Sequence, residues 1–208
     1  MLNYLSILRE SQMFSDIANE DLKIFLNNAA ILEVKKKTIL YLEGSTDDNV
    51  YLIIKGSVRG YSTLKGKQLV EIFLTEGQVF ANFNTLFLGI PSKNTIESMT
   101  SCVLLTFSKV FLFNKLQTSP QMHFNFYKIL TQYINVYNDR LKLILLYPLA
   151  IQSYIKFIEV FKDYYEEFPS KDIASYLGIT PEALARVKKS LKLSGSPICE
   201  MGDADFSS

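Results

Sequence analysis

A group of charged side chains near the C-terminal end of the chain has the chemistry needed to read a nucleic acid. The guanidinium of Arg186 suits bidentate contact with guanine, and the carboxylate of Glu182 can accept a hydrogen bond from cytosine. Neighbouring lysines can neutralise backbone phosphates. The candidate DNA-contacting residues are Lys171, Thr180, Glu182, Ala183, Arg186, Lys188 and Lys189. The alternative is a basic helix face that meets only solvent.

Two short helices and a tight turn would position these residues, and the local sequence predicts that arrangement. Ser170 is expected to cap the first helix, and Asp172 falls in its first turn, where the helix dipole favours a negative charge. Gly178 suits the left-handed residue that ends a helix. Thr180 can cap the second helix, with Pro181 at its first position. This succession is typical of a helix-turn-helix.

The distribution of charge supports this interpretation. The 208 residues carry 22 basic and 21 acidic side chains, so the net charge is only +1. Residues 169–193 hold five basic and two acidic side chains, net +3, whereas residues 194–208 hold three acidic ones, net −3. A basic block therefore coincides with the predicted helix pair. The acidic segment that follows is rich in Gly and Ser and is expected to be disordered.

The scarcity of histidine and cysteine removes several classes of chemistry. The chain has one histidine, His123, and two cysteines, Cys102 and Cys199. Zinc sites, Cys-ligated iron–sulfur clusters and disulfide scaffolds need more such residues. The multi-histidine metal site of a cupin enzyme is excluded for the same reason. We expect no metal, no cofactor and no catalytic activity, and a redox role for Cys199 stays open.

No segment is expected to enter a membrane. The longest apolar run, Leu143–Ile151, is nine residues long and contains Pro148, whereas a spanning helix needs about 20 residues. The N-terminus lacks the basic start and apolar block of a signal peptide. The sequence therefore predicts a soluble cytoplasmic protein.

Short apolar or β-branched runs that alternate with glycine turns predict an antiparallel β-domain over residues 31–107. A hairpin tip is expected at Leu64–Lys67, where Gly66 can adopt a positive φ. A short amphipathic helix, capped by Ser15, is expected before this region over residues 15–30. The predicted strands are Thr38–Leu42, Val50–Ile54, Ser57–Thr63, Gln68–Leu74, Gln78–Ala81, Asn94–Met99 and Cys102–Phe107.

A long helix is predicted from Pro120, and a heptad pattern runs along it until Pro148 ends it. Such a stripe can pack on the chain's own β-domain or on a second copy. Because other faces of this helix are also apolar, one face can pack on the β-domain while the heptad face meets a second copy in a homodimer seam. Its residues are Tyr127, Leu130, Ile134, Tyr137, Leu141 and Ile144. A further helix is expected at about 149–165, with core residues that include Tyr154 and Phe161.

Residues 38–193 resemble a Crp/Fnr-type transcription regulator. The matching stretches are Glu43–Gly44, Tyr51–Arg59, Gly66–Lys67 and Glu76–Gly77, and then Ile173–Glu182 with Arg186. The last of these is similar to the form common among Bacteroidetes members. The resemblance implies an α+β fold with a jelly-roll-like antiparallel β-roll, a long dimerisation helix and a C-terminal helix-turn-helix domain. The expected divisions are 1–118, 119–147, 148–193 and a tail at 194–208.

The sequence departs from the family at the effector site. Members that bind cyclic AMP start their phosphate-binding cassette with Gly-Glu and place an Arg and a Ser or Thr after it. Here Gln78 follows Gly77, and Ser92 or Lys93 stands where the Arg is expected, which removes the strongest phosphate contact. We therefore expect an unknown effector other than cyclic AMP, or none. The candidate pocket residues are Gly77, Gln78, Val79, Ser92, Lys93 and Asn94.

The resemblance implies a homodimer that binds an inverted repeat in double-stranded DNA, with half-sites roughly 34 Å apart. RNA polymerase is a further partner that it implies. Residues 194–208 contain no alternating strand pair, so the β-hairpin wing that often follows the recognition helix is expected to be missing. The competing hypothesis is a small-molecule or protein-binding sensor whose helix-turn-helix no longer reads DNA.

Overall fold

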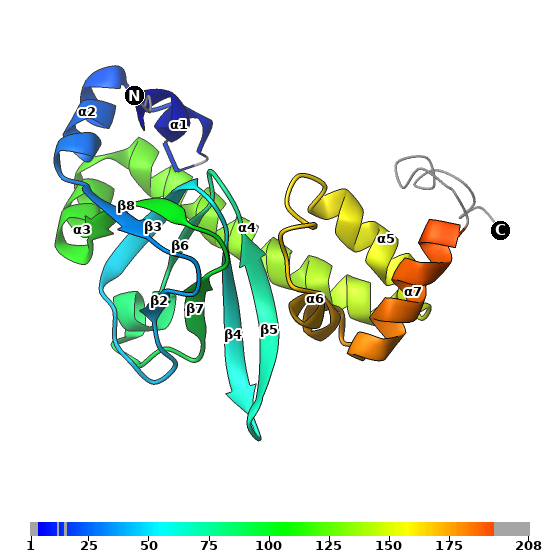
Figure 1. Ribbon diagram of the computed structural model, residues 1–208. Coiled ribbons are helices and arrows are strands. Elements are labelled where there is room, and N and C mark those ends of the chain that lie inside the picture. The colour runs from blue at the N-terminus through cyan, green and yellow to red at the C-terminus, as the bar shows by residue number, and fades with distance from the viewer. Residues whose placement is uncertain (1–3, 12, 15, 194–208) are drawn as a thin grey trace.

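The computed structural model describes residues 4–11, 13–14 and 16–193, and only the backbone of Leu193. A β-domain lies at one end, the long helix α4 (Pro120–Leu145) runs out of it, and three helices pack at the far end of α4 (Figure 1). No helix of the described residues is both long enough and apolar enough to span a membrane.

The elements combine a sheet region with helices at both ends of the chain, which confirms the expected α+β class. The remaining helices are α1 (Tyr4–Glu10), α2 (Asn19–Asn27), the short π-helix η1 (Asn84–Leu88), α3 (Lys109–Thr118), α5 (Ala150–Val160), α6 (Ser170–Leu177) and α7 (Pro181–Leu193). The strands are β1 (Ala30–Val34), β2 (Ile39–Tyr41), β3 (Asn49–Lys55), β4 (Val58–Leu64), β5 (Lys67–Leu74), β6 (Val79–Ala81), β7 (Thr95–Ser98) and β8 (Cys102–Ser108).

Two four-stranded antiparallel sheets form the β-domain, in the orders β1-β8-β3-β6 and β2-β7-β4-β5. Strand β3 reads as one apolar run from Val50 to Ile54 because both of its faces are covered. Tyr51 and Ile53 pack in the core between the sheets, and the alternate residues pack in the core that the β-domain shares with the helices. The seven predicted strands correspond to β2–β8 and are confirmed. Strand β1 is an edge strand whose residues from Ala30 to Glu33 are exposed.

The predicted hairpin joins β4 to β5. Leu64 pairs with Lys67, and the two residues between them have positive φ, 49° at Lys65 and 76° at Gly66. Two successive residues with positive φ give the turn whose twist matches that of the flanking strands. The hairpin projects beyond the rest of the β-domain (Figure 1).

The N-terminal helices cover one end of the β-domain. The helix expected over residues 15–30 is shorter in the structure: α2 begins after Ala18 and ends at Asn27. Ser15, its expected cap, lies outside the described residues. Phe25 of α2 packs edge-on against Phe14 and Phe107, with ring centroids 4.9 and 5.9 Å away.

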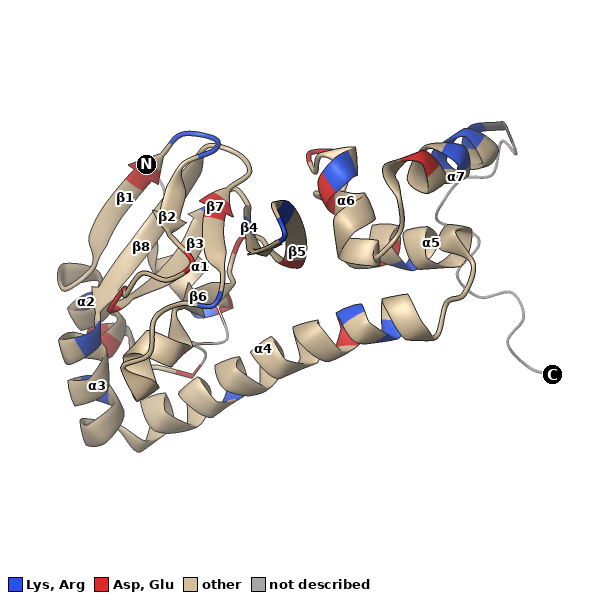
Figure 2. Ribbon diagram, turned by 90° about the horizontal axis from the view of Figure 1, so that it is seen from below, with Lys and Arg blue, Asp and Glu red and all other residues tan. Residues whose placement is uncertain are grey.

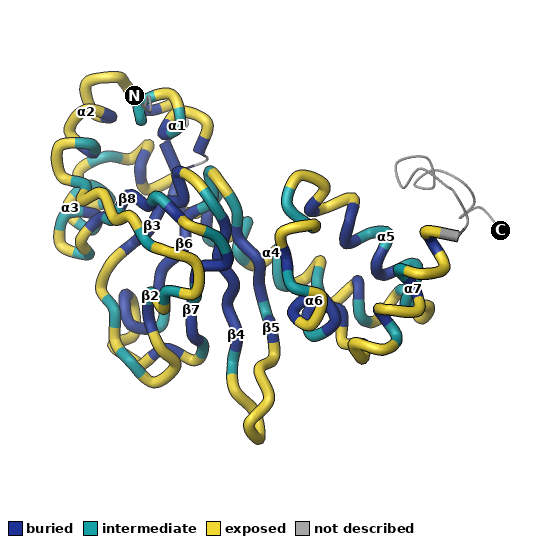
Figure 3. Tube along the Cα trace, in the orientation of Figure 1, coloured by how far each residue is buried: buried dark blue, intermediate teal, exposed yellow. Residues whose placement is uncertain are grey.

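Helix α4 confirms the long helix predicted from Pro120. The Ser119 hydroxyl accepts a hydrogen bond from the Met122 N–H at 3.3 Å, and Pro120 needs no partner for its nitrogen at the first position. Phe126 and Ile129 pack into the core of the β-domain. Further along, Leu143 packs among the C-terminal helices. Strands β4 and β5 are buried where they lie within the β-domain and exposed towards the tip of their hairpin (Figure 3).

Helices α5, α6 and α7 share one hydrophobic core with the β4–β5 hairpin. Phe73 of β5 stacks on Phe168, with ring centroids 4.4 Å apart, and its ring also lies edge-on to Phe157 and Phe161. The aromatic residues predicted as core for the helix after Pro148 are buried, as expected of Tyr154 and Phe161. The C-terminal helices are therefore held against the β-domain as well as against α4.

Candidate DNA-binding surface and effector pocket

Helices α6 and α7 with the turn between them have the local geometry that the sequence predicts. Gly178 ends α6 in the left-handed conformation, with φ 68°. The Thr180 hydroxyl accepts a hydrogen bond from the Ala183 N–H at 3.1 Å, and Pro181 is the first residue of α7. The cap at Thr180 therefore fixes where α7 begins, and the burial of Leu184 and Val187 decides which of its faces points outward.

The exposed face of α7 carries most of the residues that were expected to contact DNA. Glu182, Arg186 and Lys189 are exposed, and Ala183 is half-buried. The backbone N–H of Glu182 and the Thr180 hydroxyl hold the pKa of the Glu182 carboxyl below its ordinary value. Basic residues lie along the outer side of α7 and at the start of α6, where Lys171 is exposed (Figure 2).

Ser170 and Lys188 differ from the expectation. The residue that caps α6 is Pro169, and Ser170 is already helical. The Ser170 hydroxyl instead accepts a hydrogen bond from the Lys188 ammonium at 2.8 Å, which also lies 5.6 Å from the ring centroid of Tyr154. Burial and the neighbouring Lys192 lower the pKa of Lys188. Lys188 therefore holds α7 to α6 and α5, whereas the sequence predicted an outward phosphate contact.

Asp172 does more than occupy the first turn of α6. It is buried, and its carboxylate lies 2.5 Å from the Arg59 guanidinium of β4. Arg59 also contacts the carboxylate of Glu97 in β7 at 2.7 Å and the side chain of Gln68 at 3.2 Å. Burial raises the pKa of Asp172, and the nearby charges of Arg59 and Lys171 oppose that rise. We call these three charged residues, Arg59, Glu97 and Asp172, the Arg59 network. The network joins β4 and β7 of the β-domain to α6.

Three further hydrogen bonds hold α6 in place. The Ser175 hydroxyl accepts a hydrogen bond from the Val70 N–H at 2.9 Å and donates one to the Gln68 carbonyl at 3.2 Å. From the other side, Arg140 of α4 donates to the Tyr176 carbonyl at 3.0 Å. The first helix of the helix-turn-helix is thus bonded to β5 and α4 through its backbone and side chains.

The predicted effector residues form two groups that bond to different neighbours. The Gly77 N–H donates to the Ile53 carbonyl at 2.8 Å, the Gln78 side chain accepts from the Thr75 N–H at 2.8 Å, and Val79 belongs to β6. The second group bonds elsewhere: the Ser92 hydroxyl donates to the Asn94 carbonyl, the Asn94 amide reaches Glu71 at 3.4 Å, and Lys93 is exposed.

A buried polar pair that the sequence analysis did not single out lies between these two groups along the sequence. Asn82 and Thr85 are buried, their side chains are hydrogen-bonded to each other, and they flank the start of η1. The Thr85 hydroxyl also donates to the Ile90 carbonyl at 2.9 Å. The signal that could have revealed them is the presence of polar residues inside the otherwise apolar run from Phe80 to Leu88, where Asn84 is the third.

The interior of the β-roll next to α4 is filled by aromatic side chains. The cavity lined by Gln78 and Val79 has a volume of about 10 Å³, and its other walls are Leu74, Ile129, Gln132, Tyr133 and Val136. Phe80 stacks on Tyr51 with ring centroids 4.8 Å apart, and burial raises the pKa of Tyr133. Small-molecule pockets usually measure about 300–1,000 Å³. A nucleotide would not fit into this cavity unless the side chains that line it moved.

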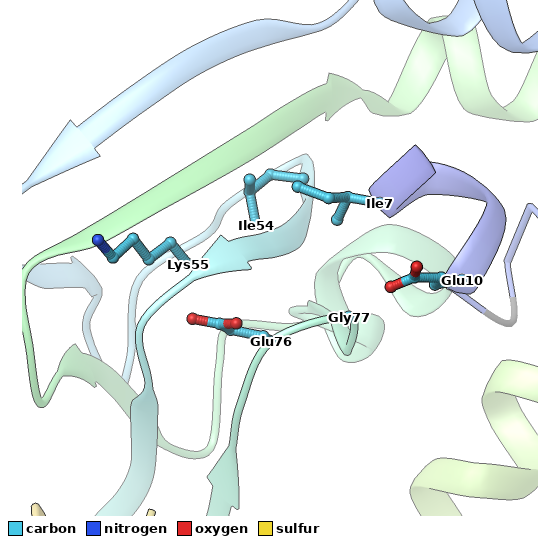
Figure 4. A pocket seen from close by; sticks show the side chains of 6 residues that line it. All are labelled: Ile7, Glu10, Ile54, Lys55, Glu76 and Gly77. Atoms are coloured by element: carbon cyan, nitrogen blue, oxygen red, sulfur yellow. The ribbon is translucent and has the colours of Figure 1, made fainter. Parts of the chain in front are cut away.

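A larger hollow of about 480 Å³ lies between α1, the end of β3 and the turn that follows β5. Figure 4 shows the Glu76 carboxylate and the Lys55 ammonium on one side of it and Glu10 of α1 on the other. Glu76 is partly engaged, since its side chain accepts a hydrogen bond from the Gly56 N–H at 3.0 Å. Gly77 is the residue of the predicted effector set that contributes to this hollow.

The heptad residues of α4 divide into two sets. Tyr127, Ile134 and Leu141 are exposed, by 55%, 61% and 49%. The other three are half-buried in their own chain: Leu130 packs on the core beneath α1 and α2, Tyr137 on the core between the sheets, and Ile144 beside Gly178. The exposed line of α4 continues instead through Phe124 and Leu145.

Cys102 and His123 have different surroundings in the described part of the chain. Among the described residues, no group of three His, Cys, Asp or Glu side chains could hold a metal ion. Cys102 is buried, and its thiol donates to the Ser57 carbonyl at 3.3 Å. His123 is exposed and stacks on Tyr127, with ring centroids 4.9 Å apart. Cys199 lies outside the described residues.

Comparisons with known proteins agree with this architecture. Residues 31–119 match the family described as the cyclic nucleotide-binding domain. No curated protein matches the chain. The structure of FixK2 from Bradyrhizobium japonicum is 20% identical, with a TM-score of 0.72 and coverage of 80% of this chain and 86% of that one. The chain has the fold of the Crp/Fnr transcription regulators.

Other structures with the Crp/Fnr fold are similarly related. The c-di-GMP-responsive global regulator CLP from Xanthomonas campestris is 18% identical, with a TM-score of 0.67 and coverage of 86% of this chain and 93% of that one. The catabolite activator protein of Thermus thermophilus is 18% identical, with a TM-score of 0.56 and coverage of 90% and 92%. The Xanthomonas protein is described as a regulator that links cell–cell signalling to virulence gene expression, and the Thermus protein as a catabolite activator.

Proposed function

We propose that the chain is a homodimeric DNA-binding regulator, in which the β-roll senses an effector and controls the placement of the helix-turn-helix. The observation that carries this proposal is the outer face of α7. There Glu182, Arg186 and Lys189 are exposed on a helix whose start is fixed by the Thr180 cap. Arg186 would recognise a base, Glu182 and Ala183 would assist, and Lys171, Thr180 and Lys189 would position the backbone.

The effector we propose is not cyclic AMP. The cavity beside Gln78 and Val79 is about 10 Å³, and the cationic side chain nearest to the expected position of the phosphate-binding Arg, Lys93, is exposed. A lysine offers a point charge and cannot make the bidentate contact that a guanidinium makes with a phosphate. These features support an effector of different chemistry, or a regulator without one.

The two copies would meet along α4. Tyr127, Ile134 and Leu141 recur every seven residues and are exposed, which supports a seam through this line of the helix. A two-fold axis through the seam would place two copies of α7 in successive major grooves. The operator would then be an inverted repeat with half-sites roughly 34 Å apart. RNA polymerase is a further partner of this proposal.

The experiment is a binding titration on operators selected from a random duplex library with the wild-type protein. Replacement of Arg186 by Ala should weaken binding by about 1–3 kcal/mol and relax base preference at one position of each half-site. Lys189→Ala should weaken binding to all sequences alike and lower the salt slope by about 1, since one phosphate is no longer neutralised. Lys23→Ala, which removes an exposed lysine of α2, is the matched control.

Equal binding of wild type and Arg186→Ala to every sequence, at every salt concentration, contradicts sequence-specific reading by α7. The competing function is a sensor whose helix-turn-helix no longer reads DNA, and the internal engagement of Lys188 with Ser170 favours it because this lysine is withdrawn from phosphate contact. A dimer without DNA affinity at low salt, but with a melting temperature raised by a metabolite, would support that second function.

A further inference from the structure

A stripe of three cations runs along α7 to the C-terminal end of that helix. Arg186, Lys189 and Lys192 are exposed and follow one another at intervals of three residues, and we call them the α7 stripe. Side chains three residues apart on a helix are neighbours on its surface. Figure 2 shows basic residues towards the end of α7, beyond the acidic residue at its start. None of the three cations forms an ion pair with another described residue, so the stripe presents positive charge that this part of the chain leaves unpaired.

The cations near the end of α7 repel one another. Lys188 lies one turn before Lys192, and like charges at this spacing destabilise a helix. Burial lowers the pKa of Lys188, and the charge of Lys192 lowers it further. The helix dipole places about half a negative charge at this end, which is less than the positive charge of the lysines. An anion beside the last turns of α7 would therefore relieve a repulsion that no ion pair of the described residues relieves.

The acidic segment that follows α7 carries the complementary charge. Residues 194–208 lie outside the described part of the chain, and their sequence holds Glu200, Asp203 and Asp205 and no basic residue. These three carboxylates match the three cations of the α7 stripe in number. The first four residues of the segment are Ser-Gly-Ser-Pro, and turns favour all three of these residue types. The sequence therefore joins an acidic segment to the end of a cationic helix face through a turn-forming stretch.

The acidic segment is long enough to return along the helix from which it starts. Arg186 lies seven residues before Leu193, which is about 10 Å of helix at 1.5 Å per residue. Glu200 lies seven residues after Leu193, and seven residues of extended chain span up to about 23–25 Å. The carboxylates can therefore reach every cation of the α7 stripe once the chain has reversed. Groups joined by a short linker meet at an effective concentration of millimolar order, so even weak ion pairs can form.

We propose that residues 194–208 dock on the α7 stripe of their own chain and compete with DNA phosphates for it. The inference rests on the proposed function, because α7 is the helix expected to enter the major groove. Carboxylates and phosphates both accept charge-assisted hydrogen bonds from Arg and Lys. The competition lowers the affinity for every duplex by the same factor. Random sequences offer phosphate contacts alone, so they are released at a protein concentration at which an operator with base contacts stays bound.

The docking is tested on the full chain without DNA. A nitroxide attached to Cys199 places a paramagnetic centre next to Glu200, and the other cysteine, Cys102, is buried. The variant E200Q/D203N/D205N, called the neutralised variant, keeps the length of the acidic segment and removes its charge. Broadening that it retains in the amide NMR signals of the α7 stripe comes from the covalent connection alone. Wild type should show more broadening than this variant at low salt and the same broadening at about 1 M salt, where the Debye length is about 3 Å.

Changes on the helix provide the matched control for this measurement. K189Q/K192Q removes two cations of the α7 stripe and should lose the excess broadening, whereas K23Q/K67Q removes two exposed lysines of α2 and β5 and should keep it. Equal broadening in wild type and the neutralised variant at low salt overturns the inference. Broadening that arises only between a spin-labelled chain and an isotope-labelled second chain also overturns it, because the acidic segment would then lie on another copy.

The competition is tested with a duplex of random sequence. The neutralised variant should bind it about threefold or more tightly than wild type at low salt, because three exposed ion pairs no longer have to be broken. This advantage should shrink as the salt concentration rises. E200D/D203E/D205E keeps every charge of the acidic segment and should bind as wild type does.

A control for net charge is D163N/E166Q/E167Q, which removes as many exposed carboxylates from the connection between α5 and α6. Its affinity should stay close to that of wild type, and an equal gain in this control overturns the competition because net charge alone would explain it. Equal affinity of wild type and the neutralised variant at low salt overturns the competition too. Failure of every variant to bind any duplex is a different result: it overturns the proposed function, and the NMR comparison still decides whether the acidic segment docks.

Discussion

Arg59 joins the β-domain to the helix-turn-helix through one guanidinium, and its removal tests how the domains are held together. Arg59 is 7% exposed, and the side chains of its partners Asp172 and Glu97 are 6% and 14% exposed. Arg59→Ala leaves both carboxylates buried without the cation that they share. Removal of one partner from a buried ion pair costs about 3–5 kcal/mol, and we expect a loss of unfolding free energy in that range.

The size of this loss should depend on pH. Burial raises the pKa of Asp172, and the charge of Arg59 opposes that rise. Without Arg59 the pKa of Asp172 should rise further, so the carboxyl takes up a proton more readily in the folded state. A carboxyl whose pKa is higher in the folded than in the unfolded state contributes stability at low pH. That contribution is complete below the unfolded pKa, about 3.9 for Asp, and is lost as the pH rises through the folded pKa. The deficit of Arg59→Ala should therefore shrink as the pH falls from 7 towards 4.

The assay is urea unfolding of wild type, Arg59→Ala, Asp172→Asn and the double variant at several pH values. In the double variant the buried charge at position 172 is gone, so part of the Arg59→Ala loss should be recovered and the two changes should be non-additive by at least about 1 kcal/mol. The exposed arginine Arg9 provides a control, since Arg9→Ala should lie within about 0.5 kcal/mol of wild type. A loss below about 1 kcal/mol for Arg59→Ala, with strict additivity, would refute the reasoning.

Two further changes are expected to have defined effects. Asp172→Asn keeps the uncharged form at every pH, so urea unfolding should show it gaining stability relative to wild type as the pH rises from about 4 to 7; a relative loss over that window would contradict the raised pKa of Asp172. Ile134→Asp places a carboxylate on the exposed line of α4 and should weaken dimerisation at least tenfold in sedimentation, because each buried Ile contributes about 1.5–3 kcal/mol. The neighbouring Asn135→Asp should stay dimeric, and an unaffected Ile134→Asp dimer would place the seam elsewhere.

Local sequence rules predicted the β-domain well because its strands obey them. Alternating or continuous apolar runs mark β2–β8, and glycine turns separate them. Strand β1 was not predicted. Its residues from Ala30 to Glu33 are exposed, so their sequence follows no pattern of burial. It belongs to the sheet through its pairing with β8, which lies about seventy residues later in the chain and leaves no local signal.

The heptad on α4 illustrates what a periodicity can and cannot specify. A repeat of seven shows that one stripe is apolar, but it does not say whether the β-domain or a second copy covers each residue. Tyr127 and Ile134 are exposed, whereas Tyr137 packs on the core between the sheets, with its ring centroid 5.6 Å from that of Tyr133. The choice depends on how the β-domain sits against the helix, which is a tertiary property.

Capping rules succeeded where the competing contacts were local. Thr180 caps α7 because the nearest donors are the N–H groups of its own first turn. Ser170 does not cap α6. Its hydroxyl accepts a hydrogen bond from the ammonium of Lys188, which lies eighteen residues away in the sequence. The Arg59–Asp172 pair spans 113 residues, so it was not predictable from either segment. Its signal was an arginine at the start of strand β4, where the strand is buried and a charged side chain needs a partner.

Strand β7 is bonded to the helix-turn-helix through the Arg59 network. Its Glu97 contacts Arg59, and Arg59 contacts Asp172 of α6. A shift of β7 relative to β4 would therefore alter the seating of the helix-turn-helix. An effector that moved β7 would change the placement of α7 on DNA, and a variant that broke the Arg59 network would uncouple the two.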